Sequence, residues 1–229
     1  MAYNNLLVRV IIPAYNEASS IARVINDVPT FVDEILVVCN GSTDETIQRA
    51  IKAGANVIKE PNRGYGSACL AGARYILDKP TDIIVFLDGD YSDYPEEMEK
   101  LLAPIVESNF DLVIGSRVLG HHKKGALLPQ QIFGNHLAVF FIKLFYGFKY
   151  TDLGPFRAIT KSAFEVLGMK DKDFGWTVEM QIKAIKNNIK IKEVPVSYRP
   201  RIGQSKISGT LKGSIKAGYK ILHTIYKYL

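Results

Sequence analysis

The sequence contains little cysteine and no long apolar run. Its 229 residues include two cysteines, Cys39 and Cys69, which are too few for a disulfide framework and indicate a reducing compartment. The N-terminus lacks the apolar core of a signal peptide. The longest apolar candidate, Leu137–Phe148, contains Lys143 and is shorter than the ~18 apolar residues that span a bilayer. We therefore expect a cytoplasmic protein without a membrane span.

Acidic residues are scarce at the C-terminal end. Residues 190–229 hold seven Lys and two Arg against one Glu, so the net charge of this tail is +8. The net charge of the whole chain is +6, so residues 1–189 together carry −2. Such a tail favours anionic partners, either nucleic acid or acidic lipid and phosphate. The predicted helix Gly209–Tyr228 has an apolar face and a lysine face. This pattern fits a helix lying on an anionic membrane and equally a helix packed on a protein core.

Short apolar runs alternate with helical patterns in the first half, which predicts an α/β fold with a doubly wound, mostly parallel sheet. The predicted strands are Leu7–Pro13, Glu34–Cys39, Asn56–Lys59, Asp82–Leu87 and Asp111–Gly115. The predicted helices between them are Ser19–Val28, Thr43–Ala53, Gly66–Leu77 and Pro95–Glu107. The second half predicts helices at Asn135–Phe148 and Trp176–Asn187 and a strand at Lys190–Tyr198. No repeat or linker interrupts the sequence, so one domain over residues 1–229 is the simplest organisation.

Two carboxylates, Asp88 and Asp90, follow the fourth predicted strand and are separated by one glycine. Ligands of a doubly wound sheet bind at the carboxyl ends of its strands. Carboxylate oxygens suit Mg²⁺ or Mn²⁺, which bridge diphosphate oxygens and neutralise a diphosphate leaving group. Asp-Gly-Asp is also a common turn sequence. Its position after a buried strand favours a metal site.

Cationic side chains form two further candidate sites. Arg117 follows the fifth predicted strand, where a guanidinium suits bidentate pairing with phosphate. A second group, in the segment YRPRIGQSK, has the composition of a phosphate clamp on a loop and consists of Arg199, Arg201, Ser205 and Lys206. Gly64-Tyr-Gly66 is similar to a dinucleotide fingerprint, but Cys69 stands at its third glycine position. An NAD-dependent oxidoreductase is therefore disfavoured.

Seven ordered motifs together resemble the inverting glycosyltransferase family 2, which contains dolichyl-phosphate mannose synthase and polyprenyl-phosphate glycosyltransferases. The motifs are VIIPAYNE, VVCNGSTDET, FLDGDYSDYPEE, IGSR, TDLGPFRAI, GWTVEMQ and EVPVSYRPRIGQSK. The resemblance implies a GT-A-like fold with Asp88 and Asp90 as ligands of the metal. It also implies donor-sugar nucleotide contacts from Pro13, Ala14, Tyr15, Glu17, Asn40, Ser42, Asp44, Asp88, Gly89 and Asp90. The nucleotide-sugar half is expected at about residues 1–118, the acceptor half at 119–208 and a basic helix at 209–229.

The sequence departs from the family pattern at two places that affect the site. Cys39-Asn40 stands where the family commonly has two aspartates, so the base of the donor, UDP or GDP, is not predicted. The arginine spacing is offset, so Arg199 and Arg201 remain alternatives for the acceptor phosphate together with Arg117, Ser205 and Lys206.

The resemblance implies an inverting displacement on a UDP- or GDP-hexose. A polyprenyl phosphate acceptor at the cytoplasmic membrane face needs no strong base, so Asp88 with its metal and Arg117 would carry catalysis. A lipid or soluble hydroxyl acceptor needs a carboxylate base, for which Asp152 and Glu179 are the candidates. Another class, a non-catalytic nucleotide-sugar-binding membrane adaptor, is disfavoured by the intact Asp88-Gly-Asp90. Nucleic-acid binding is least favoured because the aromatic residues of the tail lie at helical spacing.

Overall fold

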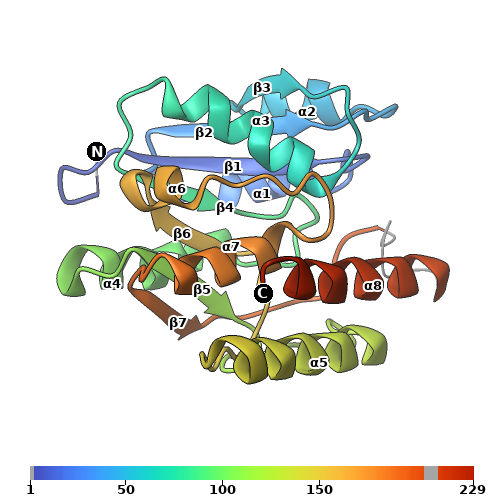
Figure 1. Cartoon of the computed structure of the whole chain (residues 1–229). Helices are drawn as coiled ribbons and strands as arrows, with labels where there is room; N and C mark the ends of the chain where they lie inside the picture. Colours follow the sequence, from blue (N-terminus) through green and yellow to red (C-terminus); the bar gives the residue numbers. More distant parts are fainter. Residues whose placement is uncertain (1–2, 204–210) are drawn as a thin grey trace.

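The computed structural model describes residues 3–203 and 211–229. Within these residues a seven-stranded sheet runs in the order β3-β2-β1-β4-β6-β5-β7 (Figure 1). The strands are β1 (Val8–Ala14), β2 (Glu34–Cys39), β3 (Asn56–Lys59), β4 (Ile83–Phe86), β5 (Leu112–Ser116), β6 (Arg157–Thr160) and β7 (Ile191–Pro195). Only β6 is antiparallel to its neighbours, β4 and β5. The predicted α/β fold with a mostly parallel sheet is confirmed.

Helices cover both faces of the sheet. The helices are α1 (Ile21–Asp27), α2 (Thr46–Lys52), α3 (Tyr65–Leu77), α4 (Met98–Ser108, after a short 3-10 turn at Pro95–Glu97), α5 (Pro129–Tyr146), α6 (Lys161–Leu167), α7 (Trp176–Lys186) and α8 (Leu211–Lys227). One apolar cluster packs α1, α2 and α4 on one face, and a second packs α3, α5, α6, α7 and α8 on the other. In β1, Val10 and Ile12 face the first cluster and Ile11 faces the second. A strand buried on both faces explains its unbroken apolar run.

Trp176, the single tryptophan of the chain, fills the second cluster. Its ring lies 5.7 Å from that of Phe86 and 6.2 Å from that of Phe164, between centroids. The side chain is almost fully buried. Core packing, rather than sugar stacking, is its role.

Two elements of the second half were missed and one was placed late. Helix α5 begins at Pro129, six residues before the predicted start, because Pro129 occupies the first turn and the Gln131 side chain accepts a hydrogen bond from the Leu128 backbone. Strand β6 and helix α6 were not predicted. β6 is four residues long and holds the buried Arg157, so it shows no apolar run.

The expected nucleotide-sugar and acceptor halves share one sheet. β5, from the first half, pairs in parallel with β7, from the second, from Leu112↔Ile191 to Ser116↔Pro195. The carboxyl ends of β1, β2, β4 and β5 therefore meet one edge together with loops of the second half. Across the described ranges, the structure has no helix long and apolar enough to cross a bilayer.

Candidate active site

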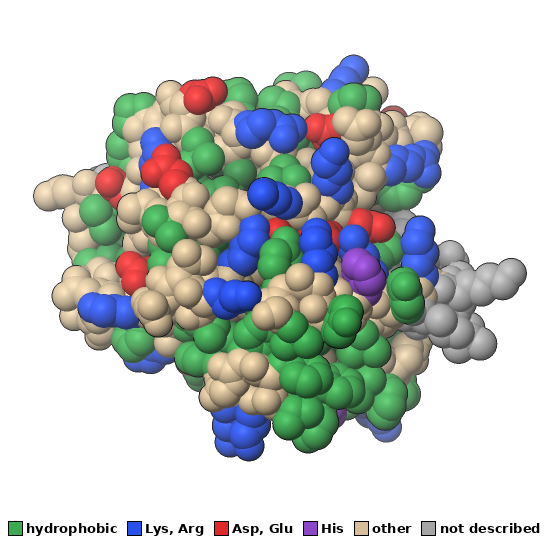
Figure 2. Space-filling model, viewed as in Figure 1, with side chains coloured by type: hydrophobic (Ala, Val, Ile, Leu, Met, Phe, Trp, Pro, Cys, Tyr) green, Lys and Arg blue, Asp and Glu red, His purple; other side chains and the backbone are tan. Residues whose placement is uncertain are grey.

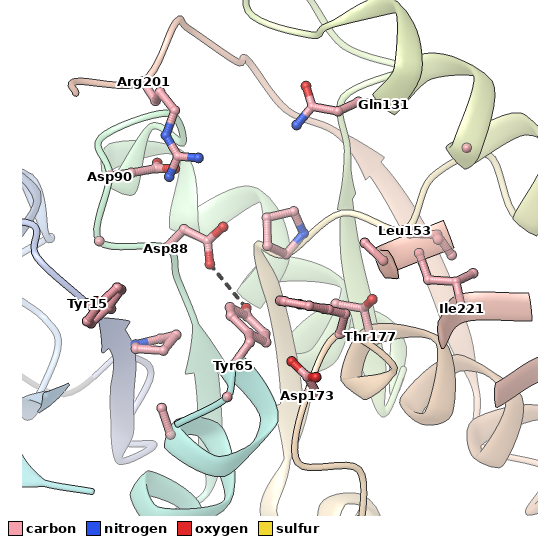
Figure 3. A pocket seen from close by; sticks show the side chains of 18 of the residues that line it. Tyr15, Tyr65, Asp88, Asp90, Gln131, Leu153, Asp173, Thr177, Arg201 and Ile221 are labelled. Atoms are coloured by element: carbon pink, nitrogen blue, oxygen red, sulfur yellow. Dashed lines mark hydrogen bonds and ion pairs between the residues drawn. The ribbon is translucent and has the colours of Figure 1, made fainter. Parts of the chain in front are cut away.

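A cleft of about 640 Å³ opens at the carboxyl edge of the sheet (Figure 3). The predicted site residues that line it are Pro13, Ala14, Tyr15, Glu17, Asn40, Asp88, Gly89, Asp90, Arg117 and Arg201. Its far side comes from the N-terminal part of α5 and from α8. Ser205 and Lys206 lie outside the described residues.

Three carboxyl groups cluster beyond the end of β4. Asp88 Oδ1 accepts a hydrogen bond from the Tyr65 hydroxyl at 3.1 Å (Figure 3). Asp90 accepts hydrogen bonds from the backbone N–H and the hydroxyl of Ser92 at 2.9 and 2.5 Å. Burial, followed by the charge of Asp90, raises the pKa of Asp88 to about 7. Asp93 is buried, and neither of its carboxylate oxygens has a hydrogen-bond partner among the described residues. Burial, followed by the charges of Asp88 and Asp90, raises the pKa of Asp93 as well.

Arg201 is a cation that lies against this acidic cluster. Its guanidinium forms an ion pair with Asp90 (Figure 3). It also lies 3.9 Å from the carboxylate of Glu17. Buried carboxylates are stable only when a positive charge lies close to them, and here the Arg201 guanidinium supplies that charge.

The donor set at this point fits Mg²⁺ or Mn²⁺. Asp88 and Asp90 both line the cleft and offer hard carboxylate oxygens. Among residues 3–203 and 211–229, no three His, Cys, Asp or Glu side chains, those of Asp88, Asp90 and Asp93 included, are arranged so that together they could hold a metal ion. A cation held by two carboxylates takes its other ligands from water and a phosphate group, which is the usual arrangement of Mg²⁺ in phosphoryl sites.

Arg117 and Asp152 form a bidentate ion pair beside the cleft. Arg117 Nε donates to Asp152 Oδ2 and Nη2 to Oδ1, both at 2.7 Å, and the Arg117 backbone N–H also donates to Oδ2 at 2.8 Å. The guanidinium lies 5.1 Å from the Tyr198 ring centroid. Asp152 itself lines a small side pocket with Arg117 and not the main cleft. In this arrangement Asp152 fixes the orientation of Arg117.

The structure puts Glu179 outside the cleft, in the contact between α7 and α8. Its carboxylate accepts hydrogen bonds from the Tyr228 hydroxyl at 2.5 Å and from the Asp171 backbone at 2.6 Å. It also forms an ion pair with Lys183 at 2.8 Å. Burial raises the pKa of Glu179, but the hydrogen bonds from Lys183 and Tyr228 outweigh it and lower the pKa below its usual range. The Tyr228 contact joins the C-terminal end of α8 to α7.

The two alternative arginines occupy different places. Arg199 stacks on Tyr91 and Tyr94, at 3.4 and 4.2 Å from the ring centroids, and donates to the backbone carbonyl of Tyr91 at 2.7 Å. It does not line the cleft, whereas Arg201 does.

Residues after β2 brace the loop after β1. Ser42 Oγ accepts from the Asn16 backbone at 3.0 Å and Asp44 from the Ala18 backbone at 3.1 Å, and neither lines the cleft. Asn40 lines the cleft, but its amide is already used in holding the chain. Nδ2 donates to the carbonyls of Glu60 and Asn62 at 3.1 and 2.6 Å, and Oδ1 accepts from the Gly64 backbone at 2.8 Å.

Several cleft residues were not among the predicted site residues. They are Arg63, Tyr65, Gln131, Asn135, Asp173, Thr177 and Lys216. The glycine pair was one available signal. A Cβ on Gly64 or Gly66 would collide with the carbonyl oxygen of Lys172 or Asp171, so these glycines let α3 pack against the loop that brings Asp173 to the cleft.

Known proteins are similar to this chain in sequence or in fold. An uncharacterised glycosyltransferase of Mycobacterium tuberculosis is 34% identical over 213 residues, 92% of this chain and 94% of the relative. An undecaprenyl-phosphate mannosyltransferase of Micrococcus luteus is 29% identical over 89% of this chain and 88% of its own length. Glucosyl-3-phosphoglycerate synthase from M. tuberculosis, solved with Mn²⁺, UDP and phosphoglyceric acid, superposes with a TM-score of 0.80 at 20% identity, covering 98% of this chain and 79% of that one. This likeness shows that the fold is GT-A-like.

The family is decided by the sequence match. The profile of glycosyl transferase family 2 matches residues 9–168, which is more than half of the chain and includes the carboxylates after β4. The protein therefore belongs to glycosyl transferase family 2 and is a glycosyltransferase.

Proposed function

We propose that this glycosyltransferase moves a hexose from a UDP- or GDP-sugar to a polyprenyl phosphate, with Mg²⁺ or Mn²⁺ at Asp88 and Asp90. The observation that carries the proposal is the make-up of the cleft. One continuous cavity joins the carboxylate pair to Arg117, Arg201 and Lys216 and ends between α5 and α8. A diphosphate with its cation suits the first part and an acceptor phosphate suits the cations. The mannosyltransferase of M. luteus is named for such an acceptor.

The loop after β1 and the residue after β2 would receive the nucleoside. Tyr15 presents an aromatic ring at this end of the cleft, with the Arg63 guanidinium 4.8 Å from its centroid. Such a pair offers stacking and positive charge to a nucleotide. The bound metal would neutralise the charge that develops on the diphosphate leaving group.

The transfer itself is a single displacement. A phosphate oxygen of the acceptor attacks the anomeric carbon from the face opposite the leaving group, and the bond to the diphosphate oxygen breaks with its electron pair. The nucleoside diphosphate leaves, the configuration inverts and no proton is transferred. Arg117, fixed by Asp152, and Arg201 hold the two anionic reactants together, which is chiefly an effect of positioning.

The candidate bases support a phosphate over a hydroxyl acceptor. Asp152 is engaged by Arg117 through both oxygens, and Glu179 lies outside the cleft. A hydroxyl acceptor remains the second candidate because Asp173, another carboxylate, lines the cleft.

Calorimetric titration and a transfer assay test the proposal. We expect UDP or GDP to bind tightly only with Mn²⁺, and Asp90→Ala to abolish that binding while Asp78→Ala, an exposed control on the end of α3, retains it. With the sugar donor so identified, product should form on a short-chain polyprenyl phosphate and not on the corresponding alcohol. Transfer to hydroxyl acceptors alone, abolished in Asp173→Asn, would replace the proposal with the second candidate.

A further inference from the structure

Helix α5 is apolar on two sides, and only one of them is covered by the described part of the chain. Ala138 and Ile142 are fully buried in the core cluster. Phe133, Phe140 and Leu144, 70%, 57% and 61% exposed, follow one another at helical spacing on another face. Figure 2 shows the hydrophobic side chains gathered over α5, at the lower edge of the molecule in that view. We call Phe133, Phe140 and Leu144 the apolar ridge.

The surroundings of the apolar ridge are positively charged. No acidic residue occurs between Arg117 and Thr151, and Lys143 and Lys149 of this stretch are exposed. Helix α8, which also contains no acidic residue, packs beside α5, where the Tyr146 hydroxyl donates to the Ile225 carbonyl at 2.6 Å.

The C-terminal helix contributes its polar side to this surface. Ile225 is buried in the core cluster, and Leu222 packs against it. Of the predicted apolar face of this helix, Leu222 is therefore packed on protein, whereas Tyr219, Tyr226 and Leu229 are exposed. Lys227 is exposed beside these tyrosines. Tyrosine and lysine side chains suit the headgroup level of a bilayer.

The active-site cleft ends between the same two helices. α5 contributes Gln131 and Gly134 to the cleft, and α8 contributes Gly218 and Ile221. Gly134 is next in sequence to the ridge residue Phe133. The apolar ridge and this part of the cleft lining therefore belong to the same helix, on different faces of it.

We propose that the apolar ridge and the lysines around it dock on an anionic lipid bilayer, with Phe133, Phe140 and Leu144 inserted among the lipid headgroups. Apolar side chains bordered by cations, without acidic residues between them, match the charge of acidic lipid and the depth of the headgroup boundary. A second copy of the chain matches poorly, because two such surfaces would bring lysine against lysine. The docking surface deepens the proposed function by presenting the cleft to a membrane-borne acceptor, but it stands on its own contacts.

Vesicle flotation tests the docking surface without donor or acceptor. We expect the protein to float with phosphatidylcholine vesicles that contain phosphatidylglycerol and far less with phosphatidylcholine alone. Phe140→Ser with Leu144→Ser should lower the partition coefficient by about tenfold for each side chain, because each loses its apolar burial. The matched control is Ile51→Ser with Val166→Ser, two similarly exposed apolar residues on α2 and α6, which should float like the unaltered protein.

Three outcomes would overturn the proposal. The first is that the unaltered protein does not float with anionic vesicles. The second is that the ridge variant floats as well as the control variant. The third is a lipid-free dimer in sedimentation that the ridge substitutions dissociate, which would assign the surface to a second copy.

Transfer to a water-soluble short-chain acceptor, measured without vesicles, should be equal in the ridge variant and the control. A failure of that reaction in both would count against the proposed function and leave the docking surface standing.

Discussion

The guanidinium of Arg201 forms an ion pair with Asp90, one of the two carboxylates that follow β4. An arginine from the second half of the chain thus lies against the proposed metal site, and it offsets the charge of buried carboxyl groups whose ionisation is otherwise unfavourable. A divalent cation at Asp88 and Asp90 would have to displace it or share Asp90 with it. Arg201 would then be available for a phosphate group.

Replacing Arg201 by glutamine is predicted to tighten Mn²⁺ binding to the nucleotide-free protein by about tenfold, because a competing positive charge is removed. Turnover should fall, because the same substitution removes a cation from the phosphate-binding part of the cleft. Isothermal titration with Mn²⁺ measures the first effect. Arg199→Gln is the control, since Arg199 lies outside the cleft. Equal Mn²⁺ affinities in the two variants would show that the ion pair does not compete with the metal.

Asp152→Asn is predicted to lower kcat by about 100-fold through misplacement of Arg117, whose guanidinium it holds at two points. The shape of the pH profile of kcat/KM should stay unchanged, because an orienting carboxylate takes up no proton in the reaction. Double substitution of Arg117 and Asp152 by alanine should cost little more than the larger single effect. Loss of the acidic limb of the profile in Asp152→Asn would instead identify Asp152 as a general base.

Asn40→Asp is predicted to destabilise the fold by about 2 kcal/mol, although it restores the residue type common in the family. A carboxylate would face the carbonyl oxygens of Glu60 and Asn62, which now accept from the Asn40 amide. Urea unfolding measures the change, with Asn188→Asp, at an exposed position after α7, as control. An unchanged stability together with tighter nucleotide binding would mean that position 40 reads the base.

The part of the site at the carboxyl ends of β1, β2 and β4 could be predicted, because the sequence patterns that indicate it are local. Strands such as β1 and β2 are apolar runs buried on both faces, and the polar residues that follow them must meet at one sheet edge. Asp88 and Asp90 are polar residues of this kind, since they follow β4. Their neighbour Asp93 is not, because only tertiary packing leaves its carboxylate buried without a partner among the described residues.

The part of the site that comes from the second half of the chain could not be predicted in the same way. β6 is too short to show a period, and its buried Arg157 donates to the carbonyls of Gly154 and Thr177 instead of to a carboxylate. Whether Arg199 or Arg201 faces the cleft depends on which one stacks on Tyr91, and spacing carries no such information. Likewise, α5 is apolar on two sides, and its sequence does not show which side packs against the core.

Glu179→Gln is predicted to lower the free energy of unfolding by about 3 kcal/mol at pH 7, because it breaks a buried ion pair with Lys183 and weakens the bonds to Tyr228 and the Asp171 backbone. The pKa of Glu179 in the folded protein lies below that of an unfolded glutamate, about 4.3. Its ionised form therefore stabilises the fold above that pH, and the contribution is lost as the pH falls through the folded-state pKa. The difference between Glu179→Gln and the unaltered protein should shrink accordingly in urea unfolding below pH 4.3. Activity per folded molecule should be retained at pH 7 and at low temperature. Loss of turnover in a fully folded Glu179→Gln would contradict this and return Glu179 to the list of candidate bases.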